Sequence, residues 1–233
     1  MIMHKSFIAL LCVLAVGLPV LAQQNDCYEM TKPGSVIRYS DYYGGMLQQY
    51  FEKTVVEVKE ENGTINITNH WAVLNRKGKP SKIIKKMGFG EGYQTAVKIE
   101  DGAYYMTYNL DLCCYPGARS GWALKIPQDL KVGDVLEGST LKFSSKGLFG
   151  NKFENEINYT DFKVVEEVDL NTKAGTIHCL KIEGRVTGVF HKSKVDTKET
   201  IYMAKNIGVV RVESPDGCIF EVVQIKNGEN NNQ

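Results

Sequence analysis

The 233-residue chain lacks an excess of either charge and lacks the motifs of common catalytic sites. Its 28 lysines and arginines almost balance 27 aspartates and glutamates. A nucleic-acid-binding surface needs a basic face that neutralises phosphates, so this balance argues against nucleic acid as a partner. The sequence contains no G-x-S-x-G, no Gly-rich phosphate loop, no acidic calcium loop and no C-x-x-C or Cys/His cluster. It therefore predicts no catalytic residues, no metal site and no cofactor, and a protein that is not an enzyme.

Histidine and paired acids give no catalytic constellation either. After the N-terminal apolar run the histidines are His70, His178 and His191. His178 precedes Cys179, but successive residues of a strand project to opposite faces and cannot form a Cys-His catalytic pair. The pairs Glu60-Glu61 and Glu166-Glu167 fall near expected strand ends, where we predict solvated charges rather than acid/base dyads.

Cysteine is too scarce for a scaffold built on disulfides. One of six cysteines, Cys12, lies in the N-terminal apolar run. The candidate disulfide cysteines are the other five: Cys27, Cys113, Cys114, Cys179 and Cys218. An odd number leaves at least one thiol free or paired between chains. For the adjacent Cys113 and Cys114, bridge geometry favours side chains on opposite faces of a strand over a vicinal disulfide.

A single long apolar run stands at the N-terminus. It spans residues 7–22, follows Lys5, is broken by Gly17 and Pro19 and gives way to polar residues after Ala22. A transmembrane helix needs about 20 apolar residues, so this run is short for a membrane span. The layout predicts a signal peptide over residues 1–22, cleaved after Ala22, and an extracytoplasmic protein, periplasmic or secreted. An uncleaved anchor and a lipidated Cys12 are the less favoured alternatives.

The remaining chain shows the period-2 patterns and turn residues of β-strands. The patterns predict strands over 35–43, 46–59, 64–68, 96–100, 103–108, 162–168, 176–187, 189–194, 199–203, 209–213 and 218–225. Asp101-Gly102 is a strong hairpin signal, and amphipathic helices are absent from the pattern. The sequence therefore predicts one antiparallel all-β domain over 23–226 and a disordered tail over 227–233.

Two irregular segments interrupt this pattern, at 108–121 and 144–156. The second places Leu148, Phe149 and Phe153 among glycines and charges. It fits either a lid over a cavity or the tip of a long hairpin, and we favour the hairpin tip.

Three segments together resemble a known family. They are residues 126–136, which contain Lys131-Val132-Gly133-Asp134, then 172–182 (TKAGTIHCLKI) and 202–213 (YMAKNIGVVRVE). Their order and spacing resemble the TapB-like proteins, a bacterial extracytoplasmic family built on a domain of unknown function, over roughly residues 30–225. The resemblance implies an antiparallel sheet curled into an open barrel or half-barrel, with few or no helices and no established enzymatic activity. In that family the cysteine matching Cys179 often has a cysteine partner at the position of Ile99. Because this chain has isoleucine there, the resemblance supplies no disulfide partner for Cys179.

Two functional interpretations remain open, and the sequence singles out no ligand-binding residues for either. A carrier would hold a lipid or other apolar molecule against the inner face of the curled sheet. In that case Tyr104, Met106 and Tyr108, with Val186, Gly188 and Phe190, would line a cavity. A structural or protein-interaction module of the cell envelope would instead fill its core with those side chains and bind an envelope protein at a sheet edge or loop. Neither interpretation involves a membrane-spanning segment.

Overall fold

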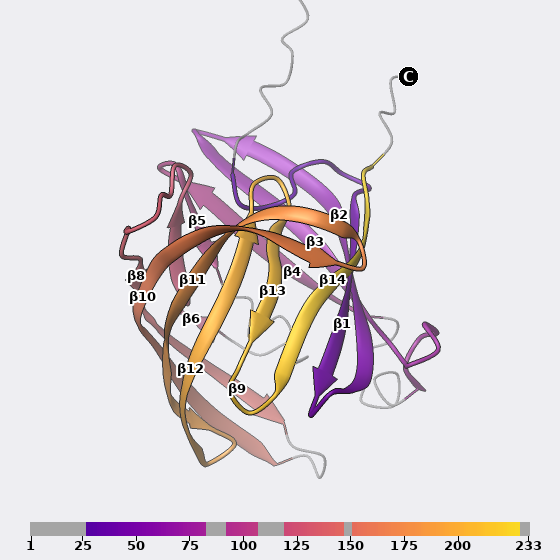
Figure 1. Cartoon of the computed structure of the whole chain (residues 1–233), viewed down its shortest axis with the longest axis vertical. Helices are drawn as coiled ribbons and strands as arrows, with labels where there is room; N and C mark the ends of the chain where they lie inside the picture. The colour runs from indigo at the N-terminus through magenta and orange to yellow at the C-terminus, as the bar shows by residue number, and fades with distance from the viewer. Residues whose placement is uncertain (1–26, 83–91, 107–118, 147–150, 229–233) are drawn as a thin grey trace, which may run out of the picture.

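Fourteen strands form one antiparallel sheet in this computed structural model, which describes residues 27–82, 92–106, 119–146 and 151–228 (Figure 1). The first half holds β1 (Val36–Tyr43), β2 (Met46–Glu61), β3 (Thr64–Leu74), β4 (Tyr93–Glu100), β5 (Ala103–Met106), β6 (Arg119–Ser120) and β7 (Leu124–Pro127). The second holds β8 (Glu137–Gly138), β9 (Thr140–Lys146), β10 (Lys152–Thr172), β11 (Gly175–Phe190), β12 (Ser193–Ala204), β13 (Gly208–Glu213) and β14 (Cys218–Lys226). The expected signal peptide lies outside the described residues.

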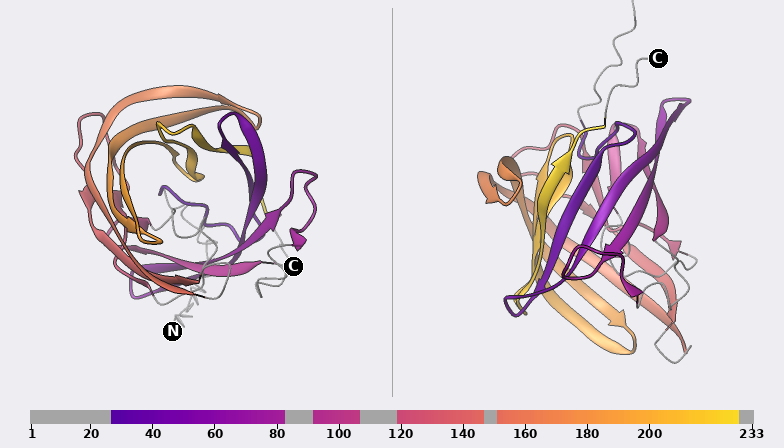
Figure 2. Two further views of the ribbon diagram at one scale, coloured as in Figure 1. Left: turned by 90° about the horizontal axis from the view of Figure 1, so that it is seen from below. Right: turned by 90° about the vertical axis from the view of Figure 1, so that its right-hand side faces the viewer.

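The sheet curls until its two ends meet, which makes it an almost closed barrel (Figure 2). The chain around β8 joins the ends. On one side β8 pairs with β7. On the other side, residues next to β8 bond to β10. Leu136 N–H donates to Phe162 O of β10 at 2.8 Å, and Tyr159 N–H of β10 donates to Ser139 O at 3.0 Å. The predicted all-β class and curled antiparallel sheet are confirmed.

The strands β6 to β9 are not among those predicted. Two further strand predictions are wrong at residues with left-handed backbone. The predicted strand over 189–194 is interrupted by the β11–β12 turn, where His191 and Lys192 have φ of 48° and 69°. The strand predicted to begin at residue 162 begins at Lys152, because Asp161 (φ 57°) forms a bulge without ending β10. β-bulges of this kind bend a strand and keep its pairing. The hairpin favoured for 144–156 is confirmed by the pairing of Lys146 with Lys152.

The end of the chain is held in the fold slightly beyond the last strand. β14 ends at Lys226, where the sequence places the boundary between domain and tail. Gly228 belongs to the expected tail, yet it is buried and its N–H donates to Ser35 Oγ at 3.0 Å. The residues after Gly228 lie outside the described part.

The interior of the barrel is built by alternation along the strands, which bulges interrupt in places. In β4, for example, Tyr93, Thr95, Val97 and Ile99 are buried and the residues between them are exposed or half-buried. Because inward residues from every wall meet one another, the buried apolar side chains form one continuous core. Burial of apolar surface at about 25 cal/mol per Å² makes this core the main stabilising term of the fold.

A segment outside the sheet, Cys27 to Ser35, completes that core at one end of the barrel. Figure 2 shows this indigo segment within the outline of the barrel. Cys27, Tyr28 and Met30 are buried, and Asn206 N–H donates to Cys27 O at 2.7 Å. The segment also brings a charge inside, because Glu29 Oε1 lies 2.5 Å from Lys53 Nζ and both side chains are almost completely buried.

Replacement of Lys53 should test this buried ion pair. Lys53→Met leaves Glu29 charged and buried without its cation, and we expect the free energy of unfolding to fall by about 3–5 kcal/mol. The double variant Glu29→Gln/Lys53→Met should recover most of that loss. Lys142→Met, which removes the exposed pair with Glu156, is the matched control and should change little. Denaturant unfolding measures all four proteins, and equal stability of Lys53→Met and wild type would contradict a structural role for the pair.

A close approach inside the barrel gives a second stability test. A Cβ added at Gly184 on β11 would lie 2.2 Å from Cγ of Phe162, a fully buried ring on β10. Gly184→Ala should therefore destabilise by about 1–3 kcal/mol through overpacking. In a Phe162→Leu background the same change should cost less, and a double-mutant cycle by denaturant unfolding measures the difference. Additive effects would show that the ring does not fill this space.

Candidate functional site

The two faces that the carrier hypothesis assigns to a cavity are packed where the structure describes them. Tyr104, Met106 and Val186 point into the barrel and are 5%, 0% and 4% exposed. Phe190 lies at the rim, with its ring centroid 6.2 Å from that of Phe143. Tyr108 lies outside the described residues. The inward orientation matches the sequence analysis, and these side chains meet other side chains rather than open space.

Aromatic rings fill the end of the barrel next to the N-terminal segment. Tyr39 stacks on Phe220 with centroids 4.4 Å apart and on Trp71 at 5.8 Å. Polar atoms of the rings are satisfied, since Trp71 Nε1–H donates to Thr95 Oγ1 at 3.1 Å and Tyr39 Oη–H donates to Val209 O at 3.2 Å. Burial raises the pKa of Tyr39 to about 12, so this hydroxyl stays neutral. This cluster is structural.

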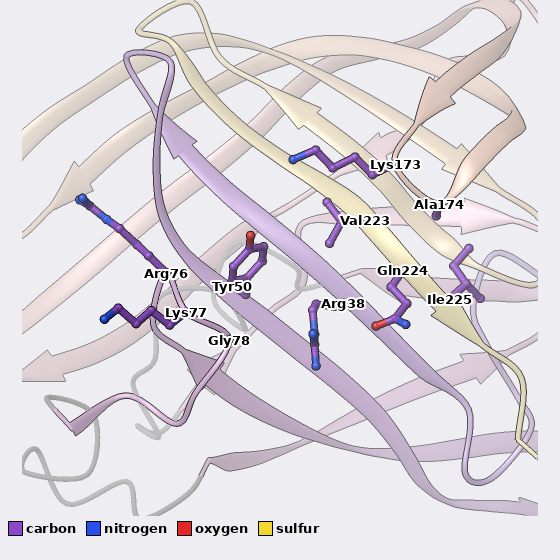
Figure 3. A pocket seen from close by; sticks show the side chains of 10 residues that line it. All are labelled: Arg38, Tyr50, Arg76, Lys77, Gly78, Lys173, Ala174, Val223, Gln224 and Ile225. Carbon is purple, nitrogen blue, oxygen red and sulfur yellow. The ribbon is translucent and has the colours of Figure 1, made fainter.

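An open site formed by described residues lies on the outer side of the barrel, over β1, β2 and β14 (Figure 3). It is a groove of about 600 Å³. Its lining residues come from those three strands, from the turn after β3 and from the β10–β11 turn: Arg38, Tyr50, Arg76, Lys77, Gly78, Lys173, Ala174, Val223, Gln224 and Ile225. We call it the outer groove.

Unequal strand lengths create one wall of the outer groove. The last residue pair between β11 and β12 is Leu180 with Met203, so the β10–β11 hairpin runs on beyond the end of β12. Its tip reaches β1, where Lys173 Nζ donates to Tyr42 Oη at 2.9 Å and lies 5.6 Å from the ring centroid.

A β-bulge shapes the floor of the outer groove. Arg38 pairs with Gln224 but Tyr39 pairs with Val222, so Val223 is the extra residue on β14. A bulge breaks the alternation of side chains. For that reason two consecutive residues, Val223 and Gln224, face the groove, whereas Ile225 pairs with the buried Ile37 and packs against the core.

The lining of the outer groove is rich in positive charge. Arg38 is neutralised by Glu52, whose Oε2 accepts from Nε at 3.0 Å and from Nη2 at 2.5 Å. Arg76, Lys77 and Lys173 are exposed, and among the described residues no carboxylate lies within ion-pair distance of these three. Arg76 has only long hydrogen bonds to Gln48, at 3.4 and 3.5 Å. The arrangement can therefore attract an anion.

Sequence reasoning did not single out these cations. The sequence predicts a turn at Lys77, and the structure confirms it. Asn75 Oδ1 fixes this turn by accepting a hydrogen bond from the N–H of Lys77 at 2.8 Å. Nothing in the sequence signals that this turn and Lys173, almost a hundred residues away, line one groove, because their meeting depends on how far the β10–β11 hairpin overhangs.

The described candidate disulfide cysteines lie on three different segments of the structure. Cys27 is in the N-terminal segment, Cys179 on β11 and Cys218 at the start of β14, and no disulfide is described among them. As predicted, Cys179 and His178 face opposite ways, since Cys179 is buried and His178 is exposed. Cys113 and Cys114 lie outside the described residues. Disulfide pairing among the five therefore stays a prediction.

The described ranges hold neither a cluster of metal ligands nor a membrane-spanning helix. No group of three or more His, Cys, Asp or Glu side chains is placed to hold a metal ion. No described helix has the length and apolarity needed to cross a membrane.

Comparison with known families decides the affiliation of the chain. The DUF3108-like family profile matches residues 32–217, from the segment that enters the barrel to the last hairpin turn. The chain belongs to the DUF3108-like family. The match does not extend to the narrower TapB-like family, so membership of that family stays a prediction. No curated protein matches the chain significantly.

Solved structures share the fold of this DUF3108-like protein. One, from Bacteroides fragilis, is described as an exported protein with a YmcC-like fold; it is 20% identical, with a TM-score of 0.69 over 87% of this chain and 100% of its own. Another, from Parabacteroides distasonis, is described as a lipoprotein; it is 14% identical, with a TM-score of 0.65 over 86% of this chain and 99% of its own. At these identities the likeness establishes the fold alone.

The thiols of this DUF3108-like protein should react slowly in the native state. Burial, with a smaller effect of Asp169, raises the pKa of Cys179 to about 12, and burial followed by Asp216 raises that of Cys218 to about 11. Alkylation requires the thiolate, so both should react with iodoacetamide far more slowly than free cysteine, Cys179 slowest, and faster as pH rises. Mass spectrometry of labelled peptides measures the rates. Rapid labelling of Cys179 in the native protein would contradict its burial. If a cysteine stays unlabelled in protein that is unfolded in the absence of a reductant, that cysteine is in a disulfide.

Proposed function

We propose that this protein is an exported, non-enzymatic binding module of the bacterial cell envelope that binds its partner molecule in the outer groove. The N-terminal apolar run supports export and cleavage after Ala22. The description of one structural relative as exported and of another as a lipoprotein agrees with it. The lack of recognisable catalytic motifs in the sequence supports a role in binding rather than catalysis.

The observation that carries the proposal is the contrast between the two sides of the sheet. Inward-facing Met106, Leu124 and Ile201 have no exposed surface, as expected of a core filled by its own side chains. Outside, the groove is open and lies between the β10–β11 turn and the turn after β3. A concave site with a few placed polar groups is the usual form of a small-molecule site. The solid-core hypothesis is therefore favoured over a carrier with a hollow interior.

One observation favours the carrier as a second candidate. Asn69 on β3 points into the barrel, is almost completely buried, and neither polar atom of its amide has a hydrogen-bond partner. It sits between Val55 and Thr95 on the neighbouring strands. Unpaired buried polar groups cost about 1–3 kcal/mol, so an internal ligand or an internal water that pairs with this amide would be stabilising.

Site-specific photocrosslinking in the native host tests the proposal. Benzoylphenylalanine at Tyr50, in the outer groove, should give a reproducible ultraviolet-dependent adduct, because a bound partner lies against this side chain. The matched control is the same replacement at Tyr105 on β5, which is also half-buried and whose chain neighbours Tyr104 and Met106 point inward. Intact-mass spectrometry of the purified protein detects the adduct.

Native mass spectrometry of the same preparations separates the two candidates. Binding in the outer groove predicts an adduct from position 50 and none of equal mass from position 105. An internal apolar ligand predicts a mass excess that disappears on denaturation and is unchanged in Tyr50→Ala. That second pattern, without an adduct at position 50, would overturn the proposed site.

A further inference from the structure

We propose that the outer groove recognises a phosphate group on an amphipathic ligand, a deeper assignment that rests on the proposed function. Arg76, Lys77 and Lys173 would neutralise the phosphate, and Tyr50 and Val223 would contact the apolar part of the ligand. The phosphate belongs either to a lipid headgroup or to a soluble phosphate ester, and the experiment below separates these sources.

The number of uncompensated cations points to phosphate. Glu52 already balances Arg38, which leaves Arg76, Lys77 and Lys173 as positive groups without a paired carboxylate in the described chain. A carboxylate carries one negative charge, whereas a phosphate monoester carries about 1.5–2 at neutral pH. Three cations in one groove match the larger charge. The planar guanidinium of Arg76 can also bind two phosphate oxygens at once, a geometry in which arginine is preferred.

Each cation is placed by its own local structure rather than by a partner carboxylate. Lys77 is carried on a turn that Asn75 Oδ1 fixes through the N–H groups of Lys77 and Lys79, at 2.8 and 3.3 Å. Lys173 is carried on the β10–β11 turn, where Thr172 Oγ1 donates to Gly175 O at 2.9 Å and accepts from Ala174 N–H at 3.0 Å. The two turns therefore hold positive charge at the groove when no ligand is bound, which lowers the ordering cost of binding.

The remaining lining fits an apolar group next to the phosphate. The bulge at Val223 directs this side chain toward the outer groove, where it is half-buried without a ligand. The half-buried ring of Tyr50 lies in the same view between Arg76 and Lys173 (Figure 3). The volume of about 600 Å³ exceeds what phosphate alone occupies and falls within the usual range for organic ligands, about 300–1,000 Å³.

The test uses the purified mature protein, two phosphate probes and two charge-matched triple variants. One probe is glycerol 3-phosphate, followed by calorimetry. The other is vesicles of phosphatidylcholine with added phosphatidic acid, a lipid phosphate monoester, followed by co-sedimentation, with pure phosphatidylcholine vesicles as the neutral reference. The groove variant is Arg76→Gln/Lys77→Gln/Lys173→Gln. The control variant, Lys131→Gln/Lys194→Gln/Lys198→Gln, removes the same charge from exposed lysines outside the outer groove.

The proposal expects wild type and the control variant to bind at least one probe with similar affinity. The groove variant should bind it at least about tenfold more weakly, since one charge-assisted contact alone contributes about that factor. Binding to both probes would show that the phosphate group suffices. Binding to the anionic vesicles alone would assign the lipid headgroup, and binding to glycerol 3-phosphate alone would assign the soluble ester.

Two results would overturn the phosphate assignment. One is failure of wild type to bind either probe. The other is equal weakening of the groove and control variants, which would mean attraction to the overall charge. Circular dichroism checks that both triples are folded, and Lys77→Gln alone replaces the groove triple if it is not. A Tyr50 crosslink whose yield is unchanged in the groove variant would keep the proposed binding site and reject phosphate as its ligand.

Discussion

Filling the interior of a closed sheet is the constraint on which the rest of this structure depends. An eight-stranded barrel is about as wide as its own side chains can fill, and width grows with the number of strands. Here fourteen strands, several of them short, share one sheet. The segment Cys27 to Ser35 supplies additional core at one end, and the Glu29–Lys53 ion pair fixes it there. Two charges inside the barrel are the consequence of building the core from a chain segment that is not a strand.

A filled interior leaves the outside of the sheet for recognition. The outer groove follows from two departures from regular pairing, the overhang of the β10–β11 hairpin beyond β12 and the bulge at Val223. The first brings Lys173 against Tyr42, far along the chain, and the second turns two consecutive β14 residues, Val223 and Gln224, toward the same space. Neither feature is needed to close the barrel.

The sequence predicts the fold well because strands with one buried face repeat every two residues and end at turn residues. Tyr93 to Glu100 is an example, although only its second half was predicted. Two errors fall where a non-glycine residue has positive φ, at Asp161 and at His191-Lys192, since propensity gives such residues no reliable signal. The strands β6 to β9 were not predicted at all. The outer groove was not predictable, because its cations belong to segments that only the tertiary structure brings together. Glu29 and Lys53 likewise look like ordinary surface charges in the sequence.

The central claim, a filled barrel that binds its ligand on the outside, is tested most directly by a crystal structure of the protein purified from its own host. The account predicts ligand density in the outer groove, beside Tyr50 and between the Arg76–Gly78 turn and Lys173, with side chains alone between opposite walls of the barrel. Elongated density inside the barrel, in contact with Asn69 and the inner faces of β3 to β5, would contradict it.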